Sequence, residues 1–193
     1  PTQRFSLHVC PRSRTAPGWG RPGVAPLLSA GLGLALLCAS SGSVRAQSQI
    51  PAQFIDQLIV QGLNEPTGLA FLPDQRLLII ERTGAVRLIA EGKLGAVDPM
   101  FVCDNVDPSG DRGATGIAID PRWPDSPYIY VYYDAADQTC KIVRYTVGGD
   151  VAISSSLYLT VDPATRYDII NDIPDLFDVH NGGSLRFGPD NML

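Results

Sequence analysis

One histidine of this sequence stands in a setting that suits acid–base chemistry. His180 lies in the stretch DVHNGGSLRFGPD (178–190), directly ahead of an apolar run that we expect to form a strand. Gly182 and Gly183 allow a positive φ or a close approach of the backbone to another group. Because imidazole titrates near neutral pH, a loop of this kind would present a proton acceptor to a cleft. The alternative is an ordinary surface histidine, since a single histidine is a weak signal.

The charge of the chain is divided unevenly. Of the 193 residues 45% are hydrophobic and 18% are charged, with 15 Lys and Arg against 20 Asp and Glu. Five arginines and no acidic residue precede Gln47, so the rest carries 10 basic and 20 acidic residues, a net charge of −10. Such an acidic body argues against DNA or RNA as a partner.

Residues 1–46 have the pattern of a signal peptide with an upstream extension. Residues 24–39 are apolar and uncharged, arginines precede them, and small residues with the A-x-A-like end Val44-Arg45-Ala46 follow. We expect cleavage after Ala46 and a secreted or periplasmic mature chain without stable membrane insertion. An uncleaved anchor is the alternative, but the apolar run is short for a span of about 20 residues.

The cysteines left after cleavage are Cys103 and Cys140. In an oxidising compartment they could form a disulfide. They could equally be two separate buried thiols, because the sequence does not show whether their Cα atoms lie within roughly 7 Å. Both possibilities stay open at this point.

The body of the chain repeats a pattern of short strands. Three segments begin alike and reach a proline at the same place: PTGLAFLP (66–73), ATGIAIDP (114–121) and GGSLRFGP (182–189). Further strands are expected after the first two of them, at 76–82, 85–89 and 100–103 and at 127–133, 141–147 and 156–160. Four strands that recur every 45 to 70 residues or so are typical of β-propeller blades.

We therefore expect an all-β fold, a β-propeller of which about two and a half blades are present. One blade cannot bury both of its faces, whereas blades around an axis bury them against each other. The small residues that open each inner strand, Thr67-Gly68, Thr115-Gly116 and Gly183-Ser184, suit close packing near the channel. Since propellers have roughly four to eight blades, residues 47–193 would be the N-terminal part of a domain truncated at its C-terminal end.

Three stretches have a recognisable order and spacing: LNEPTGLAFLPD (63–74) with ERTG (81–84), GDRGATGIAIDP (110–121) with PYIYV (127–131), and HNGGSLRFGPD (180–190). They resemble the glucose/sorbosone dehydrogenase family, six-bladed propellers that use pyrroloquinoline quinone (PQQ) to oxidise sugars. The resemblance implies an oxidoreductase that converts the C1 hydroxyl of an aldose to a lactone. It also implies calcium as a cofactor and an external electron acceptor as a partner.

The same resemblance implies roles for particular residues. His180 matches the family's catalytic histidine, the general base on the C1 hydroxyl, while PQQ takes the hydride. Asp111 falls where well-studied members carry a glutamine that contacts cofactor or substrate. Arg112 would contact an anionic cofactor or pair with a carboxylate. Val179 departs from the aspartate that usually precedes the histidine, and Ser184 from a usual arginine. We assign no metal ligand, because most family residues for PQQ and calcium lie in later blades.

Two other functions stay open. A non-catalytic secreted propeller could bind carbohydrate or protein, and fold alone does not separate it from an enzyme. Val179 and Asp111 favour the binding protein, whereas the presence of His180 favours the enzyme. A hydrolase of the lactonase type would need a metal cage of acidic residues and asparagine, which we cannot assemble from this sequence.

Overall fold

The computed structural model describes residues 3–9, 51 and 53–193. The apolar run at 24–39 and the expected cleavage site lie outside these residues. β1 (Gln3–Val9) and β2 (Ile55–Leu63) form a two-stranded sheet. The other strands belong to one compact unit that includes Leu58–Leu193. Within the described ranges, no helix is long and apolar enough to cross a membrane.

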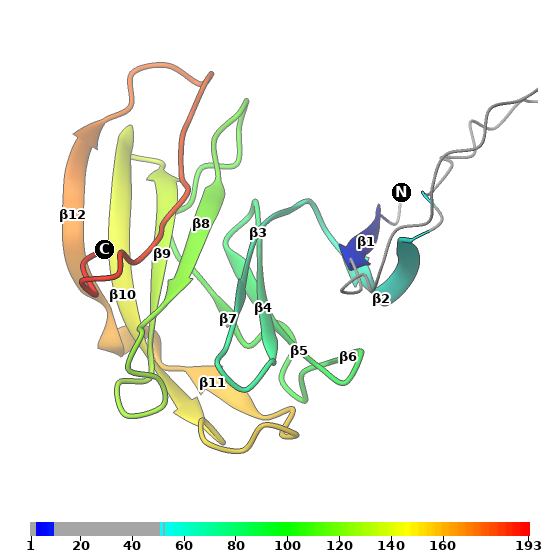
Figure 1. The fold of residues 1–193 in the computed structure, drawn as a ribbon. Coiled ribbons are helices and arrows are strands. Elements are labelled where there is room, and N and C mark those ends of the chain that lie inside the picture. The colour runs from blue at the N-terminus through cyan, green and yellow to red at the C-terminus, as the bar shows by residue number, and fades with distance from the viewer. Residues whose placement is uncertain (1–2, 10–50, 52) are drawn as a thin grey trace, which may run out of the picture. The chain divides into compact units, whose positions relative to one another are not determined.

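The first blade is an antiparallel meander (Figure 1). Its strands, from the inside outward, are β3 (Pro66–Phe71), β4 (Leu77–Glu81), β5 (Ala85–Ala90) and β7 (Phe101–Val102). The short strand β6 (Lys93–Leu94) pairs with the other half of β5. Gly84 makes the tight turn between β4 and β5 possible, because its φ of 93° is a value that glycine adopts easily.

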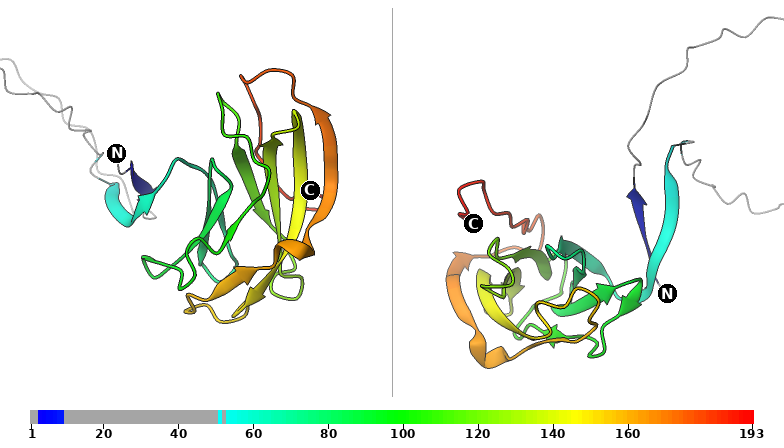
Figure 2. Two further views of the ribbon diagram at one scale, coloured as in Figure 1. Left: turned by 180° about the vertical axis from the view of Figure 1, so that it is seen from behind. Right: turned by 60° about the horizontal axis from the view of Figure 1, so that its bottom comes forward.

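The second blade repeats the meander with longer strands. They are β8 (Ala114–Ile119), β9 (Tyr128–Ala135), β10 (Thr139–Gly149) and β12 (Tyr167–Pro174). The end of β10 also pairs with β11 (Leu159–Val161), and the 3-10 turn η1 (Pro163–Thr165) leads from β11 to β12. Figure 2 shows the two sheets side by side in both views.

One hydrophobic core lies between the two blades. All five residues of β4 are buried, and in β9 the buried positions Ile129, Val131 and Tyr133 alternate with half-buried tyrosines. The three buried residues of β9 share a cluster with Leu78 and Ile80 of β4 and with Val86 and Leu88 of β5, and each of these seven side chains is inaccessible to solvent. Burial of one such side chain stabilises the fold by about 1.5–3 kcal/mol. The expectation of a β-propeller, present as two blades and the beginning of a third, is therefore confirmed.

A threonine at the start of each inner strand joins it to the next. Thr67 Oγ1 donates to Ala114 O at 2.6 Å, and Thr115 Oγ1 donates to Gly182 O at 2.8 Å. The same hydroxyl-to-carbonyl bond thus connects β3 to β8 and β8 to the segment after His180.

The glycine after each threonine leaves room for this approach. A Cβ on Gly68 would lie 3.2 Å from Thr115 O, and a Cβ on Gly116 would overlap Gly183 O. The prediction that small residues open the inner strands because they pack closely is confirmed.

Two expectations about strands were wrong. Residues 182–189, expected to repeat the inner strand, form no strand, because the hydrogen bond from Thr115 Oγ1 to Gly182 O is not continued by a ladder of backbone hydrogen bonds to β8. The outer strand of the second blade is β12 rather than 156–160, where β11 covers only Leu159–Val161. β12 gave no clear signal because all eight of its residues are exposed, so no face of it has to be apolar.

Candidate functional site

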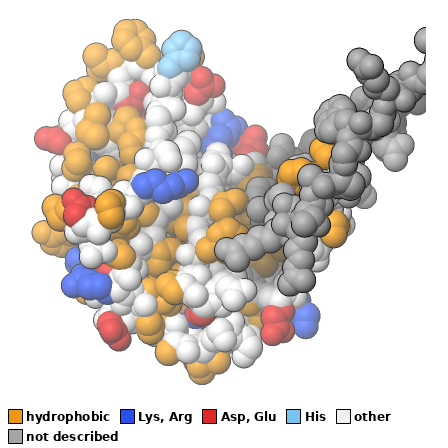
Figure 3. Space-filling view, in the orientation of Figure 1, with side chains coloured by type: hydrophobic (Ala, Val, Ile, Leu, Met, Phe, Trp, Pro, Cys, Tyr) orange, Lys and Arg blue, Asp and Glu red, His pale blue; other side chains and the backbone are white. Residues whose placement is uncertain are grey.

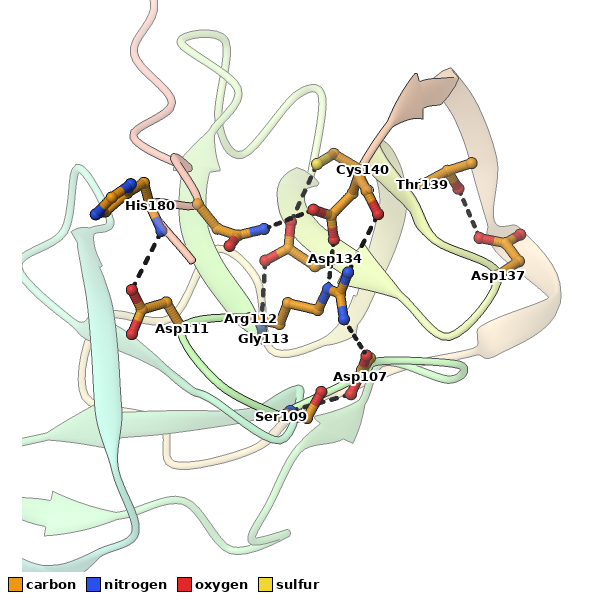
Figure 4. A network of polar contacts seen from close by, with 12 residues as sticks. Asp107, Ser109, Asp111, Arg112, Gly113, Asp134, Asp137, Thr139, Cys140 and His180 are labelled. Carbon is orange, nitrogen blue, oxygen red and sulfur yellow. Dashed lines mark hydrogen bonds and ion pairs between the residues drawn. The ribbon is translucent and has the colours of Figure 1, made fainter. Parts of the chain in front are cut away.

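Two loops meet at the start of β8. The loop before β8 contributes Asp111, whose backbone N donates to Asp178 O at 2.8 Å. The loop after β12 contributes His180, whose backbone N donates to Asp111 Oδ2 at 3.2 Å (Figure 4). Gly110 permits this packing, since its φ is 57° and a Cβ there would overlap Asp178 O. The structure therefore brings the two residues singled out in the sequence into direct contact.

His180 presents its ring to solvent from an unusual backbone conformation. It is exposed, its φ is 63°, and its imidazole forms no hydrogen bond within the part of the chain that the structure describes. Its apolar neighbours Leu176, Phe177 and Val179 are 71%, 74% and 51% exposed. Figure 3 shows hydrophobic side chains gathered beside the histidine at this end of the face. The imidazole ring is consequently open to solvent.

Arg112 lies buried beneath this loop. Its Nε donates to Asp175 Oδ2 at 2.5 Å and its Nη2 to Asp175 O at 3.1 Å, while Nη1 lies 3.3 Å from Asp107 Oδ2. The hydrogen bond to Asp175 raises the pKa of Arg112, and hydrogen bonds from Ser109 lower the pKa of Asp107. The expectation that Arg112 would pair with a carboxylate is borne out, and its charge is fully committed to the protein.

A second buried carboxylate lies next to Asp175. Asp134 is inaccessible to solvent, and it accepts hydrogen bonds from Gly113 N at 3.1 Å and from Cys140 Sγ at 3.1 Å (Figure 4). Ligand atoms of Asp134, Cys140 and Asp175 lie within 4.8 Å of one another. The set does not fit calcium, which takes oxygen ligands, because one member is a thiol and Arg112 already neutralises Asp175.

Both cysteines of the described body are free thiols. Cys103 and Cys140 are buried, and Cys103 Sγ lies 3.5 Å from Tyr145 Oη. Burial raises the pKa of each thiol to about 11. Of the two possibilities that the sequence left open, separate buried thiols is the one observed.

A hollow of about 270 Å³ runs along the inner strands next to the His180 loop. Its lining includes the starts of β3 and β8 and residues 182–184 and 186. Arg186 donates only to Leu185 O and forms no ion pair among the residues that the structure describes. A guanidinium without a carboxylate partner can accept an anionic group of a ligand.

Sequence reasoning missed two residues of the site. Asn181 Nδ2 donates to Asp175 Oδ1 at 3.1 Å, which links the residue after His180 to the buried ion pair. Asn181 lies in the stretch HNGGSLRFGPD (180–190), which resembles the family, so the sequence offered a signal for it. Asp175 gave no signal, because 63 positions separate it from Arg112.

Comparisons with known proteins agree with this architecture. The glucose/sorbosone dehydrogenase family model matches residues 63–193. Hedgehog-interacting protein of Homo sapiens is 29% identical over 157 residues, covering 72% of this chain and 21% of that protein. Quinoprotein glucose dehydrogenase B of Acinetobacter calcoaceticus is 25% identical over 145 residues, covering 72% of this chain and 30% of that protein.

Solved structures with a similar fold include sugar dehydrogenases. An oxidoreductase (glucose dehydrogenase) from Thermus thermophilus is 34% identical with a TM-score of 0.55, covering 69% of this chain and 37% of that one. The PQQ-bound aldose sugar dehydrogenase of Streptomyces coelicolor is 31% identical with a TM-score of 0.56, covering 69% and 38%. The chain thus spans less than two fifths of the length of these relatives. Since the family model covers most of the sequence and the blades have the family's fold, the chain belongs to the glucose/sorbosone dehydrogenase family.

Proposed function

We propose that the protein containing this chain is a PQQ-dependent dehydrogenase that oxidises the C1 hydroxyl of an aldose to a lactone. The observation that carries the proposal is the setting of His180. Its ring is exposed, while its backbone is held by Asp111 beside the hollow along the inner strands. Membership of the family and the likeness to a PQQ-bound aldose sugar dehydrogenase support it.

In this proposal His180 acts as the general base. A neutral ring nitrogen accepts the proton of the C1 hydroxyl as the C1 hydride leaves. PQQ, when bound, supplies the hydride acceptor, and an external acceptor then takes the electrons. Asp111 Oδ2 is occupied by the backbone N of His180, so Oδ1 would make the contact to cofactor or sugar that we propose for this residue.

The residues present fit one of the two implied cofactors. The carboxylates of PQQ require cations, and Arg186 offers to the hollow a guanidinium that has no ion pair within the described part of the chain. For calcium the donor set of Asp134, Cys140 and Asp175 is unsuitable, as the thiol and Arg112 show. We therefore derive no step that involves calcium from these residues.

The test is a dye-reduction assay on the intact protein with PQQ, calcium and a panel of aldoses. His180→Asn is the informative variant, because asparagine tolerates a positive φ and removes only the base. Sugar-dependent reduction that falls by at least a hundredfold in His180→Asn supports the proposal. Absence of reduction together with absence of PQQ binding, followed by absorbance, would sink it.

A second function is favoured by a specific observation. Val179 replaces the usual aspartate, and it forms an exposed apolar group with Leu176 and Phe177 next to His180. A non-catalytic propeller that binds carbohydrate or protein would use such a group. The 29% identity to Hedgehog-interacting protein supports this alternative. Glycan-array or partner binding that Phe177→Ala abolishes, in a protein that binds no PQQ, would establish it.

We also propose that the protein is secreted or periplasmic. The observation behind this is the signal-peptide pattern of residues 1–46. N-terminal sequencing of protein recovered outside the cytoplasm should start at Gln47. A mature protein that retains residues 24–39 would contradict the proposed cleavage.

A further inference from the structure

The loop that carries His180 is not held in place by burial. Leu176, Phe177 and Val179 are each more than half exposed, so few apolar contacts restrain the loop. His180 itself has a φ of 63°, in the left-handed region that non-glycine residues rarely adopt. Polar bonds must therefore define where the imidazole stands.

Those bonds come from two adjacent residues, Asp111 and Arg112. Asp111 binds the loop directly, since its Oδ2 accepts a hydrogen bond from His180 N and its own N donates to Asp178 O. Arg112 restrains the loop indirectly, through Asp175. Two groups of Arg112 bind this carboxylate and its backbone carbonyl.

Asp175 connects Arg112 to the His180 loop. It is 6% exposed, and its backbone N donates to Gln138 O at 2.9 Å, which fixes it to the hairpin between β9 and β10. With Oδ2 bound to Arg112, its Oδ1 accepts from Asn181 Nδ2 at 3.1 Å. Asn181 directly follows His180, so the chain of contacts ends one residue from the ring.

We propose that Asp111 and the buried Arg112–Asp175 pair together are the positioning device for His180. This rests on the proposed function, because positioning matters only if His180 meets a substrate. Displacing a catalytic group by about 1 Å can reduce the rate a hundredfold. Asp175 is 6% exposed and its carboxylate binds Arg112 and Asn181, so it acts on His180 through these residues and is a positioning residue.

The decisive variant is Asp175→Asn. The amide has one acceptor oxygen, so it can serve Arg112 or Asn181 but not both. We expect kcat to fall by about 10–100-fold with less than about a threefold change in KM, since binding groups are untouched. Asp74→Asn is the matched control, because Asp74 pairs with the buried Arg76 at 2.8 Å, away from the loop. It should leave kcat within about twofold of the unchanged protein.

Hydrogen exchange separates this proposal from the proposed function. Exchange of the backbone amides in peptides spanning 175–183 should be at least tenfold faster in Asp175→Asn and unchanged in Asp74→Asn. If the loop loosens in a protein that oxidises no sugar, the positioning role stands and the dehydrogenase fails. If exchange and kcat of Asp175→Asn match those of Asp74→Asn, the positioning role is overturned.

A milder variant covers the case in which Asp175→Asn does not fold. Asn181→Ala removes the last link and leaves the ion pair intact. It should still accelerate exchange of the His180 amide and lower kcat by about tenfold, while exchange in β4 and β9 stays unchanged. A general loss of stability would accelerate exchange in those strands as well. Unchanged exchange and unchanged kcat in Asn181→Ala would likewise overturn the proposal.

Discussion

Two buried arginines hold loops together at opposite ends of the inner strands. Arg76, in the turn after β3, has a side chain only 1% exposed, pairs with Asp74 and donates to the carbonyls of Asp150 and Val151. Arg112, just before β8, has a side chain 11% exposed and pairs with Asp175. The chemistry is the same at both ends, but only the second arginine fixes the loop that carries His180. A buried ion pair is therefore no sign of function by itself, and its meaning depends on the loop that it holds.

The largest expected effect is on stability, at the Arg76 end. Arg76→Ala would leave the half-buried carboxylate of Asp74 and several carbonyls without their donor, at a cost of about 3–5 kcal/mol in the free energy of unfolding. Hydrogen exchange at 175–183 should stay unchanged in this variant while the protein is folded. Denaturant unfolding with exchange on the same samples tests both statements. Faster exchange in the His180 loop would show that the two ends are coupled.

The second-largest expected effect on stability lies at the Arg112 end and requires no change of either arginine. Gly116→Ala would place a methyl group against Gly183 O and push residues 182–187 away from β8, costing about 1–3 kcal/mol by overpacking. Gly182→Ala is the control, since a Cβ there has nothing within 4 Å. Its free energy of unfolding should change by less than about 0.5 kcal/mol. Equal losses in the two variants would contradict the close packing of these glycines.

Alkaline pH should lower the stability of the protein through two thiols, Cys103 in the core and Cys140 near the Arg112–Asp175 pair. The folded pKa values of Cys103 and Cys140 are about 11, above the ordinary 9.0. The folded state then holds these protons more tightly, so the stability they contribute is complete below pH 9 and is lost as the pH rises toward 11. For the two thiols together we expect a loss of about 2–2.5 kcal/mol between pH 8.5 and 10. Denaturant unfolding at each pH measures it.

Single substitutions divide that loss between the two regions. Cys140→Ser and Cys103→Ser should each lose about half as much stability over this pH range as the unchanged protein does. A pH dependence that neither substitution alters would show that other groups, such as Tyr133 with its pKa of about 12, are responsible.

The smallest effect concerns the second partner of Arg112. Asp107→Asn removes a contact of 3.3 Å, and we expect less than about 1 kcal/mol at neutral pH because Asp175 retains the guanidinium. The pKa of Asp107 is lowered in the folded state, so its contribution is present above its ordinary pKa of 3.8 and disappears as the pH falls. Unfolding curves of the two proteins should converge below that pH. A larger loss at neutral pH would make Asp107 an equal partner in holding Arg112.

The sequence predicted the fold better than it predicted the site. Apolar runs and turn prolines located the inner strands β3 and β8 and the strands β4 and β9 next to them, because burial between the blades requires apolar side chains such as Leu78 and Val131. β12 imposes no such pattern and was missed. His180 and Asp111 were predicted from motif positions, and the structure brings them together.

The contacts of Arg112 and Asp175 that hold the His180 loop could not be predicted from the sequence, for a physical reason. Asp175 meets Arg112 only because β10 pairs with both β9 and β12, which folds two distant loops to one end of the blade. Each of these charges, taken alone, looks like a solvated turn residue. Their partnership exists only after the sheet is assembled.

The threonine–glycine start of each inner strand has a consequence for how such a protein can evolve. Thr67 donates to the carbonyl at the start of β8, Thr115 donates to Gly182 O in the segment after β12, and the glycine next to each threonine leaves room for the approaching backbone. The threonine that donates this hydrogen bond and the glycine beside it therefore belong to the same blade. A gene segment for one blade that is duplicated carries with it the means to attach its own copy.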